Sequence, residues 1–285
     1  MSSELDMLWS EHSENPSQVQ KIVEDRITEN SDMSQEVQGY LNLFQHLILE
    51  HTFDQTSADR IINKLKLTLN LNPQISDFLV RFETAVSIFF SNNIEFEDLR
   101  KLDDSKKVRV LSSLVGAFSG KNNYALAEKA LIYAISLSKD LSDDDPAHKS
   151  LAINSNNLAC SLEEMENLSF DQESLLEKAS QTALNEWEIA GGWIETERAY
   201  YRLASGYLKI NKLVDAVINA NKCLTICINN SAPALELFFA YEILAKIEKR
   251  SGQQVRSLIK MQEYFEKLSD SDKAWTKRYL DSFLD

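Results

Sequence analysis

The sequence predicts an all-α protein, and three observations support this prediction. The 285-residue chain holds only seven Gly and four Pro, too few for the frequent turns of a sheet-rich fold. Apolar residues recur three and four positions apart, which is the period of a buried helix face, and no long run alternates strictly. Each Pro precedes a helix-like pattern and suits a first helical turn: Pro16, Pro73, Pro146 and Pro233.

The N-terminal part is expected to begin with a flexible acidic segment over residues 1–14, followed by helices over residues 15–104. The apolar period indicates helix faces around Val23, Phe44 and Phe82. An Asn or Asp stands before three of the prolines and can cap the helix that follows, as Asn72 does before Pro73. Residues 96–102 are expected to form a short helix.

Four segments between residues 105 and 270 share one layout. In each, a helix with Leu and a small residue precedes a helix that carries Ala or Ser at one-turn intervals. Short side chains let the two helices of a hairpin approach closely, and Ala204 opposite Ala216 would allow this. One hairpin cannot bury its apolar face alone, so neighbouring hairpins must stack. The clearest segment contains Tyr200, Leu203, Ala204, Tyr207, Ala216 and Ala220.

This layout resembles the tetratricopeptide repeat, whose pattern is W-x2-L-G-x2-Y, then A-x3-F, then P, over about 34 residues. The equivalent positions Leu114, Leu158, Leu203 and Leu244 lie 44, 45 and 41 residues apart, so each unit is lengthened. The resemblance implies a right-handed α-solenoid of antiparallel hairpins, with four hairpins over 105–270. It also implies diverged hairpins over 15–104 and a capping helix over 271–285.

In tetratricopeptide proteins the first helix of each hairpin lines a concave groove that holds peptides. The resemblance therefore implies a partner-binding surface on these helices. Arg198 and Arg202 lie one turn apart, so their guanidinium groups can converge on a carboxylate through parallel hydrogen bonds. The expected partner-binding residues are Asn156, Asn157, Arg198, Tyr201, Arg202, Ser205, Lys209, Lys246 and Arg250.

Simpler roles for these residues stay open at this stage. Arg198 and Arg202 can instead pair with Glu195, Glu197 or acids of the next hairpin. Asn157 matches an Asn of the carboxylate-clamp subfamily, but such an Asn also holds adjacent helices together. The clamp is incomplete, because the Lys and Asn of the subfamily's first repeat correspond to Ser112 and Gly116 here.

Catalytic and metal-binding patterns are absent from the sequence. There is no phosphate-binding loop, dinucleotide fingerprint, nucleophile elbow or H-E-x-x-H motif. His46 and His51 are five residues apart, which places them on different faces of an α-helix, so neither a metal nor a cofactor is expected. Cys223 and Cys227 share a helix face; we interpret them as small buried core residues rather than half of a metal site.

The composition excludes several classes of partner. The net charge of −14 disfavours non-specific contact with nucleic acid and anionic lipid. With neither a secretory signal nor a run of about 20 apolar residues, the expected compartment is the cytoplasm.

The sequence thus predicts a non-catalytic adaptor that binds an acidic peptide or protein segment in the groove of the solenoid. Self-association as a homodimer through end hairpins is a further expectation. Two alternatives are a peptide-responsive regulatory sensor of the long-repeat bacterial type, and an enzyme whose site lacks a recognised motif.

Overall fold

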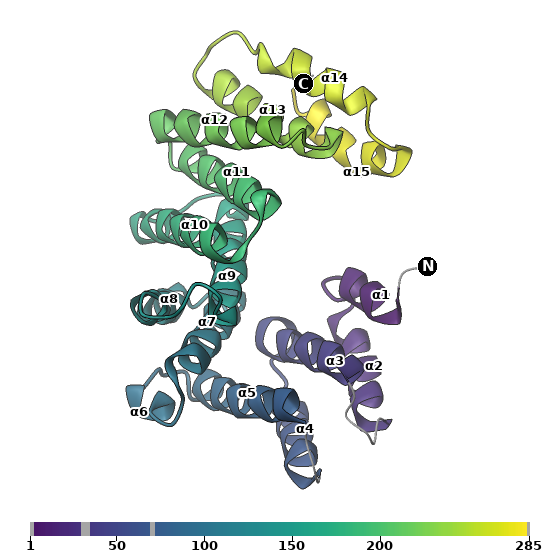
Figure 1. Ribbon diagram of the computed structural model, residues 1–285, viewed down its shortest axis with the longest axis vertical. Coiled ribbons are helices and arrows are strands. Elements are labelled where there is room, and N and C mark those ends of the chain that lie inside the picture. Colours follow the sequence, from purple (N-terminus) through teal and green to yellow (C-terminus); the bar gives the residue numbers. More distant parts are fainter. Residues whose placement is uncertain (1–2, 30–34, 69–71, 284–285) are drawn as a thin grey trace. The chain divides into compact units, whose positions relative to one another are not determined.

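The computed structural model describes residues 3–29, 35–68 and 72–283, and every regular element within these ranges is helical (Figure 1). The prediction of an all-α fold is therefore confirmed for this part of the chain. The helices group into two compact units, Met1–Asn154 and Ser155–Asp285, referred to below as the N-terminal and C-terminal units.

The N-terminal unit is a series of antiparallel helices. Helices α2 and α3, α4 and α5, and α7 and α8 pack as consecutive pairs, and α5 also packs on α7. Phe44, Phe78 and Phe82 are fully buried between them. The elements are α1 (Glu4–Glu11), α2 (Pro16–Glu29), α3 (Gln35–His46), η1 (Leu47–Thr52), α4 (Gln55–Leu67), α5 (Pro73–Ser91), α6 (Phe96–Leu99), α7 (Asp104–Gly120) and α8 (Tyr124–Ser138), and α9 (Pro146–Glu164) begins here.

Helix α1 lies within residues 1–14, where the sequence predicts a flexible segment; Met1 and Ser2 are outside the described residues. A capping box stabilises its first turn. The Asp6 N–H donates to Ser3 Oγ at 3.2 Å, and the Ser3 N–H donates to Asp6 Oδ2 at 2.9 Å. Glu4 then pairs with Arg26 of α2 at 2.7 Å, so α1 is docked on its neighbour.

The helix starts agree with the positions of the prolines. Pro16, Pro73 and Pro146 are the first residues of α2, α5 and α9, and Pro233 directly precedes α13 (Ala234–Arg250). Asn72 caps α5 as expected, because its side chain accepts a hydrogen bond from the Ile75 N–H at 2.9 Å. The short helix expected within residues 96–102 is confirmed as α6.

The segment η1 is a π-helix, which the sequence did not predict. Hydrogen bonds in a π-helix run from residue i to i+5, so residues five apart lie on the same face. The expectation that His46 and His51 occupy different faces is therefore wrong, and their Nε2 atoms lie 3.1 Å apart. Phe53 ends η1 in the left-handed region (φ 53°), with its N–H donating to the Ile48 carbonyl.

The C-terminal unit continues the pattern of hairpins. Helix α11 packs on α12 and α13 on α14, while α10 packs on α11, α12 on α13 and α11 also on α13. Ala204 and Ala216 are fully buried in one cluster with Ile243, as the close approach of the two helices requires. The elements after α9 are α10 (Phe170–Ala190), α11 (Trp193–Lys209), α12 (Leu213–Asn229), α13, α14 (Ser257–Glu266) and α15 (Asp270–Asp281).

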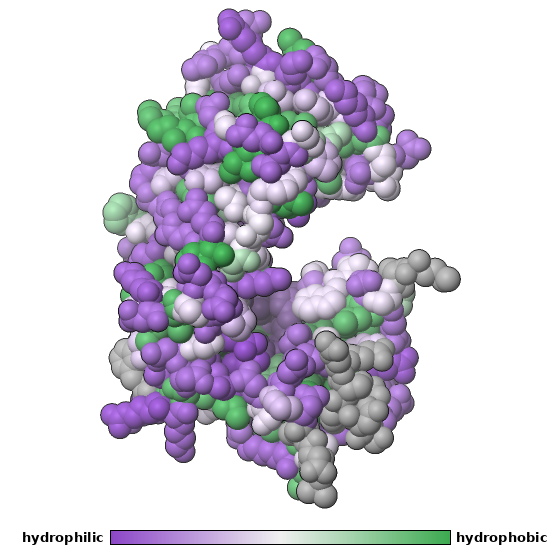
Figure 2. All heavy atoms as spheres, viewed as in Figure 1, coloured by the Kyte–Doolittle hydropathy of each residue, from purple (hydrophilic) through white to green (hydrophobic). Residues whose placement is uncertain are grey.

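The surface that Figure 2 draws is mostly hydrophilic, with apolar side chains among the polar ones. Several exposed apolar residues belong to α12, among them Val214, Ile218 and Ile228. Among the described residues, no helix combines the length and the apolar character that a membrane crossing needs.

Candidate functional site

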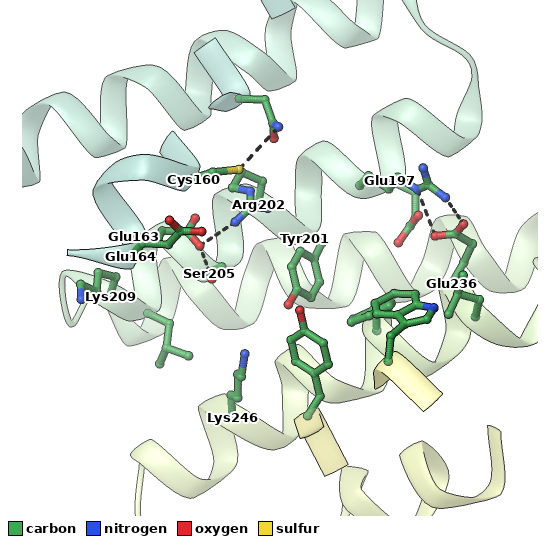
Figure 3. Close-up of a pocket in the computed structure, with 17 residues that line it drawn as sticks. Cys160, Glu163, Glu164, Glu197, Tyr201, Arg202, Ser205, Lys209, Glu236 and Lys246 are labelled. Carbon is green, nitrogen blue, oxygen red and sulfur yellow. Dashed lines mark hydrogen bonds and ion pairs between the residues drawn. The ribbon is translucent and has the colours of Figure 1, made fainter. Parts of the chain in front are cut away.

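A cavity of about 860 Å³ in the C-terminal unit is lined by α9, α11, α13 and α15 (Figure 3). Helix α11 contributes one face to it, because residues three and four apart lie one above another on a helix. Seven of the nine predicted binding residues line the cavity: Asn156, Arg198, Tyr201, Arg202, Ser205, Lys209 and Lys246. The other two, Asn157 and Arg250, are exposed and are not among the lining residues.

The two arginines do not converge on one carboxylate. The Arg198 guanidinium forms a two-point contact with Glu236 of α13, and one of its hydrogen bonds, from Nε to Oε2, is 3.2 Å long. Arg202 Nη1 donates to Glu163 Oε2 of α9 at 2.7 Å. Helices α9 and α13 thus each supply a carboxylate, and both arginines form ion pairs within the chain. The acid that pairs with Arg202 comes from the preceding hairpin rather than the next one.

The two arginines differ in how accessible they are. The side chain of Arg198 is 61% exposed, whereas that of Arg202 is 24% exposed. Burial raises the pKa of Glu163, and the charge of Arg202 opposes that rise. Arg202 therefore stabilises a carboxylate that the fold has largely removed from water, while Arg198 stays within reach of a ligand.

Four more of the predicted residues have partners within the chain. The Tyr201 hydroxyl donates to Glu242 Oε2 at 3.0 Å, and the Ser205 hydroxyl donates to Glu163 Oε2 at 2.9 Å. Lys246 pairs with Glu242, and Lys209 donates to the Met165 carbonyl. The basic character that the sequence indicates for this face is thus offset by glutamates that come from flanking helices and from α11 itself.

Glu197 is a cavity residue that the sequence did not single out as a binding residue. Its side chain is buried, and this burial, followed by the negative charge of Glu236, raises its pKa to about 7. The Cys223 thiol donates to Glu197 Oε1 at 3.1 Å. Cys223 and Cys227 are fully buried, as predicted, and each offers a sulfur atom within 4.8 Å of the carboxylate. Only the packing of α11 on α12 brings these groups together.

Three buried polar atoms of the cavity residues are left without a hydrogen bond. Among the described residues these atoms are Glu163 Oε1, Glu197 Oε2 and Arg202 Nε. Buried polar groups in native proteins nearly always have a partner. These three atoms are buried away from solvent, so hydrogen bonds satisfy the charged groups beside the cavity only in part.

An aromatic cluster also lines the cavity, and it contacts Tyr201 of α11 through Phe239. Phe239 of α13 stacks on Trp275 of α15, with ring centroids 5.5 Å apart, and contacts Tyr279 edge-on at 5.3 Å. The Trp275 side chain lines the cavity, and this residue is 43% exposed. Tyr279 also packs against the cluster of Phe238 and Met261. The i, i+4 spacing of Trp275 and Tyr279 indicates an apolar helix face, but their place in a cavity depends on how α15 folds back.

Comparisons with models of protein families, with curated proteins and with solved structures found no match. The geometry of the cavity is therefore the basis for a functional assignment. It combines ion pairs formed by residues of α9, α11 and α13 with an aromatic cluster from α13 and α15. Such a pocket, mostly apolar but with a few placed polar groups, is typical of a site that orients a ligand.

Proposed function

We propose that the protein is a non-catalytic helical-repeat adaptor, a right-handed solenoid of the tetratricopeptide type. It binds a segment of another polypeptide in the cavity of the C-terminal unit. The observation that supports this function is that one cavity of about 860 Å³ is lined both by ion pairs and by an aromatic cluster. A cavity of this size accommodates a few side chains of a partner, which is the scale of a peptide anchor.

The proposed ligand segment carries both a carboxylate and an apolar side chain. Arg198 is the docking point for the carboxylate, because its side chain is largely exposed although it pairs with Glu236. A ligand carboxylate can compete with Glu236 for the same two-point hydrogen bond. Trp275 is the docking point for the apolar side chain, since an exposed aromatic ring gains most from being covered.

Peptide binding tests this proposal directly. Displayed random peptides are selected on the full chain, and the affinity of the selected peptides is measured by fluorescence anisotropy. We expect Trp275→Ala and Arg198→Ala each to weaken binding by about 10-fold or more. These residues supply a hot-spot aromatic contact and a charge-assisted hydrogen bond.

The chain offers matched controls for both variants. Arg250→Ala removes an exposed arginine outside the cavity, and Phe170→Ala removes an exposed aromatic residue that is not among the cavity's lining. Both are expected to bind like the wild type. Arg202 is less suitable for this test because its own side chain is only 24% exposed, whereas that of Arg198 is 61% exposed. Because Arg198→Ala also removes the partner of the buried Glu236, circular dichroism must first show that this variant is folded. If Trp275→Ala and Arg198→Ala keep native circular dichroism and bind selected peptides normally, the cavity is not the binding site.

A further inference from the structure

Three histidines meet in the N-terminal unit although they come from separate parts of the chain. His12 follows α1, His46 ends α3 and His51 lies in η1. Their ring centroids are 4.9 to 5.1 Å apart in all three pairings. Each can offer one ring nitrogen so that the three nitrogens lie within 4.8 Å of one another.

The spacing of these nitrogens is close to that of metal ligands. Bonds of about 2.0–2.1 Å in a tetrahedral zinc site place two ligand nitrogens roughly 3.3 Å apart. The Nε2 atoms of His46 and His51 are already 3.1 Å apart. The ligand nitrogen of His12 lies within 4.8 Å of the other two nitrogens. A movement of about 1.5 Å would bring it to the spacing of a zinc ligand.

The outer nitrogens of two rings are already engaged. His46 Nδ1 lies 2.9 Å from Glu50 Oε1, so that its Nδ1–H is held by the carboxylate. His12 Nδ1 donates to the Trp9 carbonyl at 2.5 Å. In both rings the Nε2 atom then carries the lone pair. His46 Nε2 lies within hydrogen-bond distance of His51 Nε2 (3.1 Å) and His12 Nε2 within that of Ser13 Oγ (3.2 Å), and a metal ion would replace both contacts. Histidines that bind metals are usually oriented in this way, by a carboxylate or carbonyl on the other nitrogen.

Two glycines on α7 leave room for Glu50 beside His46. A Cβ atom on Gly116 would lie 2.7 Å from Glu50 Oε1, and one on Gly120 would lie 2.8 Å from the Glu50 carbonyl oxygen. Glycine within a helix lowers its stability, so two glycines one turn apart require a local reason. They let η1 approach α7 closely enough to hold the Glu50 carboxylate against His46.

We propose that His12, His46 and His51 form a binding site for a zinc ion, with Glu50 positioning His46. Neutral imidazoles are preferred ligands of Zn²⁺ and of similar divalent transition metals. Three protein ligands leave the fourth position of a tetrahedral ion open to water or to a partner's side chain. The ion would tie α1 to α3 and η1, in addition to the Glu4–Arg26 ion pair that docks α1 on α2.

The π-helix supports this proposal independently of the distances. Single turns of π-helix are rare and occur frequently at functional sites. Here the π-helix is what brings His46 and His51 onto one face, since an α-helix would separate them. A purely structural role as an aromatic cluster with Trp9 would require neither this register nor the Glu50 contact.

Zinc titration of the full chain tests the site. The protein is treated with EDTA, transferred to metal-free reducing buffer and titrated with ZnCl₂ against a competing chromogenic chelator. We expect the chain to bind one zinc ion through these three histidines. Glu50→Gln should weaken its affinity by about 10–100-fold, and His12→Gln should weaken it further because a ligand is lost.

The control is Glu11→Gln, which removes an exposed carboxylate beside His12 and should leave the affinity unchanged. Titration with CoCl₂ separates this site from the cysteines, because thiolate ligands add a charge-transfer absorption band that imidazole ligands lack. Cobalt bound without that band, and lost in His12→Gln, supports the proposal. The proposal is overturned if the wild type binds no zinc at micromolar concentrations, or if His12→Gln binds it as tightly as the wild type does.

Discussion

Glu197 allows a quantitative prediction about the pH dependence of stability. The perturbation is Glu197→Gln, which replaces a buried carboxylate by a neutral amide of the same shape. The amide oxygen can still accept the hydrogen bond that the Cys223 thiol donates to Oε1. The substitution therefore mimics the protonated form of Glu197 and removes only the titration.

The size of the effect follows from the pKa of Glu197, which burial raises from 4.5 to about 7. Between these two values the folded state holds a proton that the unfolded state has released. Stability therefore falls as the pH rises through this window. At about 1.4 kcal/mol per pH unit, the full difference corresponds to about 3 kcal/mol. Because the Glu197 carboxyl interacts with the charge of the nearby Glu236, we expect about 1–3 kcal/mol to be measured.

Urea-induced unfolding followed by circular dichroism at pH 5 and pH 8 measures this difference. At pH 5 Glu197→Gln should be more stable than the wild type by less than about 1 kcal/mol, and at pH 8 the difference should reach its full size. Glu164→Gln, which changes an exposed glutamate beside the same cavity, is the control and should behave like the wild type at both pH values. Equal stability of Glu197→Gln and wild type at pH 8 would refute the reasoning.

Two further predictions concern close packing. Ala204→Leu places a large side chain between α11 and α12, where Ala204 and Ala216 are fully buried, and should lower the free energy of unfolding by about 1–3 kcal/mol. Urea unfolding measures it, and an unchanged midpoint would mean that the two helices are not tightly packed there. Gly116→Ala adds a Cβ 2.7 Å from Glu50 Oε1 and should weaken zinc binding together with stability. If its zinc affinity equals that of the wild type, Glu50 does not position His46.

Much of the helical architecture could be predicted because its signals are local. The apolar period and the prolines indicate the helix starts, and the small residues at Ala204 and Ala216 indicate where two helices meet. Five of the seven predicted binding residues that line the cavity lie on α11, and their shared face follows from helical geometry alone. The function of that cavity stays a proposal.

The partners of these residues could not be predicted in the same way. Glu236 and Glu163 lie 38 and 39 residues away from the arginines with which they pair. Trp275 and Tyr279 show only that α15 has an apolar face, and where this face docks depends on the turn that precedes it. Nothing in the spacing of His46 and His51 indicates a π-helix, because an α-helix with the same residues satisfies the local signals equally well.

The sequence by itself determined the class of secondary structure, the helix starts that a proline marks and most of the residues that share a helix face, since these depend on interactions within a few positions. The tertiary structure alone decided which faces meet. It paired the arginines with distant glutamates, buried Glu197 against two cysteines, and gathered three histidines around one point. Packing sets these choices, because a charge or a ring takes its properties from neighbours that the chain brings together only when it folds.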